Sequence, residues 1–137
     1  MRVVSGVAVC AAALTVAATF ARLFIGADFL DESYYLAVGY RSSLGDRPFI
    51  DELNLTQSFA LITGPLIRVF RFATGGVEGL VLYTRCLFLL LNCIAATSVF
   101  VALRRRIDGP AALLIATTCI AFIPFNVPNL SYNSLGA

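Results

Sequence analysis

The residues best suited to chemistry lie in one polar stretch, GADFLDESYYLAVGYRSSLGDRPF, at positions 26–49. It places the adjacent acids Asp31 and Glu32 just ahead of Tyr34 and Tyr35. A carboxylate at a partly dry surface has a raised pKa, which makes it a better proton acceptor near neutral pH. One acid could therefore activate a hydroxyl that attacks a sugar carbon bearing a phosphate leaving group, with the tyrosines contacting the substrate. The alternative interpretation is structural: the acids open a helix and the tyrosines anchor it at a membrane boundary.

A phosphate leaving group requires cations, and three arginines are candidates: Arg68, Arg71 and Arg85. Arg85 is the most informative because it lies inside an apolar run. A charge within a membrane costs about 2.5–3.5 kcal/mol on insertion scales, so such a residue usually faces a cavity or a partner. We therefore expect Arg85 to lie near the acidic pair. The alternative is that its long side chain extends to the lipid headgroups, and Arg68 and Arg71 are also compatible with plain interfacial cations.

The composition of the chain predicts a membrane protein. Of its 137 residues, 59% are hydrophobic and 13% are charged, whereas soluble domains carry about 25% charged residues. Histidine is absent, which removes the commonest general base and metal ligand. The four cysteines lack metal-site spacing, so we expect no metal site and no cofactor, while use of a divalent metal stays open. The net charge of +2 is too small to indicate a nucleic-acid partner.

Apolar runs and helix punctuation set the expected architecture. A helix needs about 20 apolar residues to cross a bilayer, because each residue adds about 1.5 Å of length. We expect an all-α polytopic membrane protein, with residues 1–137 as a single membrane domain that has three spans and an outer loop carrying short interfacial helices. The spans are expected at about residues 3–25, 79–103 and 110–127, the outer loop at 26–78, and its helices at Leu30–Leu44 and Gln57–Phe72. The alternative for the first span is a cleaved signal peptide.

Basic residues indicate the orientation of the expected spans. Arg2 precedes the first span, and Arg104, Arg105 and Arg106 form a short turn after the second. Positive residues favour the cytoplasmic side of a membrane. We therefore expect a cytoplasmic N-terminus, an external loop at 26–78, and location in the plasma (inner) membrane.

These features together resemble the amino-terminal part of the GT-C membrane glycosyltransferases. The shared pattern is a first span, the outer-loop motif Asp31-Glu32-x-Tyr34, an interfacial amphipathic segment, and an arginine in the outer turns of the second span, from Glu78 to Arg85. The tail PNLSYNSLGA also looks like the entry to a further span in some bacterial members. The nearest likeness is to bacterial relatives of protein O-mannosyltransferases and to the lipid A aminoarabinose transferases.

The resemblance implies an enzyme that transfers a sugar from a polyprenyl-phosphate donor to an acceptor hydroxyl outside the cytoplasm. In this pattern Asp31 matches the family's acidic base, Glu32 supports it, and Arg85 matches a phosphate-binding arginine. Metal use varies across the family. Its members have many more spans, so we expect this chain to be an incomplete N-terminal fragment that is inactive alone. The expected partners are the lipid bilayer and the polyprenyl-phosphate-sugar donor.

Two other functions stay open. The first is a small non-catalytic integral membrane protein that binds a membrane protein partner as an accessory or assembly subunit. The second is a transporter fragment. It is the weaker alternative, because the spans lack the paired Gly/Pro interruptions that are typical of a transport site at the midplane.

Overall fold

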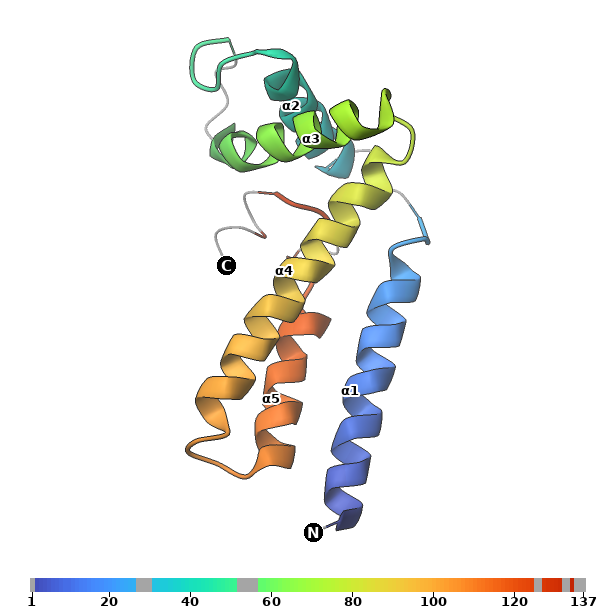
Figure 1. Cartoon of the computed structure of the whole chain (residues 1–137), viewed down its shortest axis with the longest axis vertical. Coiled ribbons are helices and arrows are strands. Elements are labelled where there is room, and N and C mark those ends of the chain that lie inside the picture. Colours follow the sequence, from blue (N-terminus) through green and yellow to red (C-terminus); the bar gives the residue numbers. More distant parts are fainter. Residues whose placement is uncertain (1, 27–30, 52–56, 125–126, 132–133, 135–137) are drawn as a thin grey trace. The chain divides into compact units, whose positions relative to one another are not determined.

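The computed structural model describes residues 2–26, 31–51, 57–124, 127–131 and 134, and the regular elements among these residues are helices, with no strand (Figure 1). The elements are α1 (Arg2–Arg22), α2 (Asp31–Leu44), the 3₁₀ turn η1 (Gln57–Phe59), α3 (Ala60–Thr74), α4 (Leu80–Leu103) and α5 (Gly109–Ala121). The all-α prediction is confirmed for this part of the chain. The chain divides into two compact units: unit 1 comprises Met1–Ile25 and Phe88–Ile123, and unit 2 comprises Gly26–Leu87 and Pro124–Ala137.

Two helices have the length and composition of a membrane span. α1 has 21 residues and α4 has 24, and both are apolar enough to cross a hydrocarbon layer. Only 11% of residues Ser5–Arg22 and 17% of residues Leu80–Leu103 are buried within the chain, so large apolar side chains such as Leu14 and Leu90 are exposed. A core helix of a water-soluble protein would instead bury its apolar face. This exposure is the pattern expected of helices that face lipid.

The third expected span is shorter than the sequence predicted. α5 has 13 residues, which corresponds to about 20 Å of helix, and it ends at Ala121. Its start follows the expected turn, because the Asp108 carboxylate accepts a hydrogen bond from the Ala111 backbone N–H at 3.1 Å. Its end lies where Phe122 turns to an extended backbone, two residues before Pro124, which cannot donate a backbone hydrogen bond. α5 is therefore a short apolar helix.

Small residues hold α1 and α5 together in unit 1. The two helices lie side by side (Figure 1), and Ala8, Ala112 and Ala116 are almost fully buried. Small side chains let helix backbones approach closely, which is a common packing mode between membrane helices. The Thr117 hydroxyl donates to the Leu113 carbonyl at 2.7 Å in its own helix, so it needs no partner elsewhere.

Unit 2 is built on a close crossing of α2 and α3 (Figure 1). A Cβ atom added to Gly39 on α2 would lie 2.8 Å from Thr63 Oγ1, and one added to Gly64 on α3 would lie 2.5 Å from Ser42 Oγ. Both distances are shorter than real Cβ contacts, so each helix needs glycine where it meets the other. A cluster of buried side chains from α2, α3, η1 and the segment after α5 packs at the crossing: Tyr35, Val38, Phe59, Ala60 and Val127.

The glycines that end or begin the elements of unit 2 follow the sequence pattern. Gly45, with a φ of 119°, comes directly after the last residue of α2, and Gly75, with a φ of 71°, caps α3. Left-handed backbone of this kind is accessible to glycine at little cost. The expected helix at Leu30–Leu44 is confirmed from Asp31 onward, while Leu30 lies outside the described residues.

Gly64→Ala is expected to destabilise unit 2 by about 1–3 kcal/mol, because the new methyl group overpacks the α2–α3 crossing and also meets the ring of Pro65. Thermal unfolding in detergent, followed by circular dichroism, measures the effect. Gly6→Ala is the matched control, since nothing lies within 4 Å of that position and alanine is the better helix former. Equal midpoints for the two variants would show that the crossing is not tightly packed.

Candidate functional site

The first turn of α2 and the second turn of α4 bring Glu32 and Arg85 into a bidentate ion pair. Arg85 Nε donates to Glu32 Oε1 at 2.7 Å, and Arg85 Nη2 donates to Glu32 Oε2 at 2.6 Å. The two side chains are only 5% and 3% exposed. Paired N–H groups facing two carboxylate oxygens fix both distance and orientation, so this contact joins the two helices rigidly at one point.

Two further groups in the described part of the chain hydrogen-bond to the pair. The Gly26 carbonyl accepts a second hydrogen bond from Arg85 Nη2 at 2.7 Å, and the Asn129 side-chain amide donates to Glu32 Oε1 at 3.4 Å. Asn129 is itself buried, and its side-chain oxygen Oδ1 accepts a hydrogen bond from the Leu130 backbone N–H at 2.7 Å. Buried charges are stable only when they are paired and hydrogen-bonded, and this network meets that requirement.

Asp31 lies beside the pair but in a different environment. It is the first residue of α2 and it is exposed, whereas Glu32 is buried. Adjacent residues of a helix point about 100° apart, which allows the two carboxylates to have separate roles. Asp31 is therefore an accessible carboxylate whose backbone position is held by its neighbour.

The two expected tyrosines lie on the same helix. Tyr35 is buried in the core of unit 2, where its ring meets Phe59 edge-on at a centroid distance of 5.3 Å. Tyr34 packs against that core and contacts the Tyr35 ring at 5.6 Å. In the described part of the chain, the Tyr34 hydroxyl is buried without a hydrogen-bond partner. A buried polar atom of this kind is uncommon in native structures and calls for a functional or energetic explanation.

Arg68 and Arg71 engage the opposite end of α2. Arg68 Nε donates to the Ser43 carbonyl at 3.3 Å, and Arg71 Nη1 donates to the Ser43 hydroxyl at 3.3 Å. The Arg71 guanidinium also lies over the Tyr40 ring, 5.1 Å from its centroid. Ser43 lies 11 positions after Glu32, which is about 16 Å along the helix, so the structure does not bring these arginines to Arg85. They instead complement the negative end of the α2 dipole.

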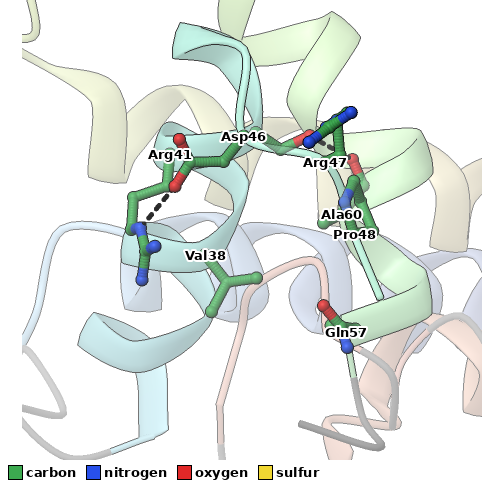
Figure 2. A pocket seen from close by; sticks show the side chains of 8 residues that line it. Val38, Arg41, Asp46, Arg47, Pro48, Gln57 and Ala60 are labelled. Carbon is green, nitrogen blue, oxygen red and sulfur yellow. Dashed lines mark hydrogen bonds and ion pairs between the residues drawn. The ribbon is translucent and has the colours of Figure 1, made fainter. Parts of the chain in front are cut away.

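A small pocket lies near that end of α2, between Val38, Arg41, Asp46, Gln57 and Ala60 (Figure 2). It offers about 10 Å³ of free space, which is close to the room for one water molecule. The Arg41 guanidinium turns toward Asp46, and their Nε and Oδ2 atoms lie 2.7 Å apart (Figure 2). The pocket is therefore too small for a sugar or a lipid phosphate.

Hydrogen bonds between Asp51 and Arg47 stabilise the loop that follows α2. The Asp51 carboxylate accepts hydrogen bonds from the Arg47 backbone N–H at 2.7 Å and from Arg47 Nε at 3.3 Å. These bonds, the backbone one above all, hold the pKa of Asp51 below its usual range. The buried Gln57 carbonyl oxygen accepts from the Phe49 N–H at 2.9 Å, which holds Phe49 at its unusual φ of 68°. These contacts order the described part of the loop, residues 45–51.

The residues that the structure describes contain no cluster of three or more cysteine, aspartate or glutamate side chains that could hold a metal ion. Comparison of the chain with protein-family models, curated proteins and solved structures finds no match. The interpretation of the site therefore depends on the geometry of the residues themselves.

Sequence reasoning missed two members of the site, Asn129 and the Gly26 carbonyl. Asn129 is 97 positions from Glu32, and a single asparagine in an uncharged tail carries no signal of that pairing. A backbone carbonyl carries no residue-type signal at all. The available hint was that a buried arginine has five N–H donors, so it needs more hydrogen-bond acceptors than one carboxylate provides.

Arg85→Met is expected to destabilise the protein by about 3–5 kcal/mol, because it leaves the Glu32 carboxylate buried without its partner. The double variant Glu32→Leu/Arg85→Met should recover most of that loss, since an apolar pair needs no compensating charge. Chemical unfolding in detergent measures both. Arg41→Met is the control, because its ion pair with Asp46 is about half exposed and worth roughly 0–1 kcal/mol. A small effect of Arg85→Met would show that the pair is not buried in the folded protein.

Tyr34→Phe is expected to raise the stability by about 1–3 kcal/mol, because it removes a buried hydroxyl that has no partner and keeps the packed ring. Tyr83→Phe is the matched control, since the Tyr83 hydroxyl donates to the Leu66 carbonyl at 3.2 Å. It should lower the stability by about 0.5–1.5 kcal/mol. If both variants lost stability equally, the Tyr34 hydroxyl would have a partner in the folded protein.

Proposed function

We propose that this chain forms part of a membrane glycosyltransferase, which transfers a sugar from a polyprenyl-phosphate donor to an acceptor hydroxyl on the extracytoplasmic side. The observation that carries the proposal is the pairing of an exposed acid, Asp31, with a neighbour, Glu32, that is locked to Arg85. A catalytic base must be accessible to its substrate and held in a fixed position. Asp31 has both properties, and its place in the Asp31-Glu32-x-Tyr34 motif agrees with the resemblance to GT-C enzymes.

The proposed reaction is a displacement at the anomeric carbon of the donor sugar. The oxygen of the acceptor hydroxyl forms a bond to that carbon, and Asp31 accepts the proton that this hydroxyl loses. The bond from the carbon to the phosphate oxygen breaks, and its electron pair leaves with the polyprenyl phosphate. Tyr34 lies three residues after Asp31 on the same side of α2, so its partly exposed ring, and not its buried hydroxyl, would contact the substrate.

The geometry favours a positioning role for Arg85. Its Nε and Nη2 groups are directed at Glu32 and Gly26, so the guanidinium holds the first turn of α2 in place. Arg68 and Arg71 are directed at Ser43, which makes them supports of the other end of α2. In this proposal the phosphate of the donor is bound by groups other than Arg68, Arg71 and Arg85.

The location that we propose is an integral position in the plasma (inner) membrane. α1 and α4 supply two spans, the N-terminus is cytoplasmic, and the segment between the two helices is external. The exposed apolar side chains of both helices support this placement, and the basic turn after α4 supports its direction.

A second candidate function is that of a non-catalytic membrane subunit. The observation in its favour is that Glu32 and Arg85 satisfy each other inside the chain, as structural ion pairs do. In that case the acidic pair would only fix α2 against α4.

Because this chain is expected to be inactive alone, sugar transfer is measured in membranes that contain it together with the further spans of the proposed enzyme, and this assay tests the two functions. A donor lipid carrying labelled mannose or aminoarabinose is supplied, and label reaching the acceptor fraction is counted. Asp31→Asn is expected to reduce transfer by about 10²–10⁴-fold, because the amide cannot accept the proton. Asp46→Asn is the matched control and should leave transfer unchanged, since Asp46 pairs with Arg41 in the loop after α2. Equal transfer by both variants would remove Asp31 from the mechanism, and no transfer by the unaltered chain together with its further spans would favour the non-catalytic subunit.

A further inference from the structure

α3 presents two different faces. One face is buried against α2 and contains Ala60, Thr63, Gly64 and Ile67. The other face is exposed although it is apolar, and it contains Leu61, Pro65, Val69 and Phe72. The spacing of these four residues, at intervals of four, four and three, puts them in one stripe along the helix. The side chains of this outer face are largely uncovered by the rest of the chain: Phe72 is 93% exposed and Val69 is 63% exposed.

Contacts with the start of α4 fix the position of α3 along the axis of α4. The Tyr83 hydroxyl donates to the Leu66 carbonyl at 3.2 Å, and the Phe70 and Tyr83 rings lie 4.7 Å apart. Tyr83 is in the first turn of α4, which is the helix with the strongest composition for a membrane span. Only five residues, Gly75 to Gly79, separate α3 from α4. The middle of α3 therefore lies level with the point where α4 begins.

We infer that the outer face of α3 lies in the boundary between lipid headgroups and acyl chains, so that α3 is a lipid-contacting helix rather than a docking site for a protein. The inference rests on the membrane position of α4 in the proposed function. A helix that starts a span at Leu80 has its first turn at the edge of the hydrocarbon, where tyrosine side chains such as Tyr83 are enriched. An apolar helix face at that level inserts about 5–10 Å below the headgroups.

The chain contains no tryptophan, so a single introduced tryptophan reports on its own surroundings. Phe72→Trp places the reporter on the outer face, and Leu90→Trp places one on an exposed position within α4. Each variant is reconstituted in phosphatidylcholine vesicles whose acyl chains carry bromine either near the headgroup or near the methyl end. Fluorescence quenching by each lipid gives the depth of the reporter. Val69→Trp serves as a second reporter if Phe72→Trp does not reconstitute.

The inference expects Phe72→Trp to lose most of its fluorescence with bromine near the headgroup and much less with bromine near the methyl end. Leu90→Trp should show the opposite order. If Leu90→Trp is quenched and Phe72→Trp is not, the outer face does not contact lipid and faces water or a protein, while the membrane position of α4 stands. If neither reporter is quenched, both this inference and the membrane location in the proposed function are wrong.

Discussion

The buried ion pair between Glu32 and Arg85 is the contact on which unit 2 depends. Its partners are 53 positions apart in the chain, and each would be costly to bury without the other. Because the bidentate geometry allows little movement, the first turn of α2, the second turn of α4 and the tail at Asn129 must meet at one point. Few other contacts in an apolar chain have this directional demand, since packing of aliphatic side chains tolerates small displacements.

α2 is held by arginines at both of its ends. Arg85 of α4 binds Glu32 at the N-terminal end, and Arg68 and Arg71 of α3 bind Ser43 at the C-terminal end. The second arrangement also agrees with the helix dipole, which favours cations near the last carbonyls. Glycines then let α3 approach between these ends, at Gly39 and Gly64. α2 is thus fixed along its whole length by its two following helices, which explains how a helix with only moderate apolar content keeps a defined position.

The helices could be predicted from the sequence because apolar runs and punctuating residues act locally. Asp108 with Pro110 marked the start of α5, and Gly45 marked the end of α2. The end of α5 was placed too late, because the apolar composition continues past Ala121 although the backbone turns at Phe122. The site was predictable only in part. A charge in an apolar run signals the need for a partner, but its identity depends on tertiary contacts, which composition and spacing do not encode.

The adjacent acids illustrate how one motif can divide its roles. Two neighbouring carboxylates differ by about 100° in direction, so a helix packed on one side buries one and exposes the other. The buried one is paired with an arginine, while the exposed one keeps access to solvent. A base that needed both anchoring and access could not obtain them from one side chain. In the proposed function the sequence Asp31-Glu32 separates the two demands: Glu32 anchors the first turn of α2 through Arg85, and Asp31 keeps access to solvent.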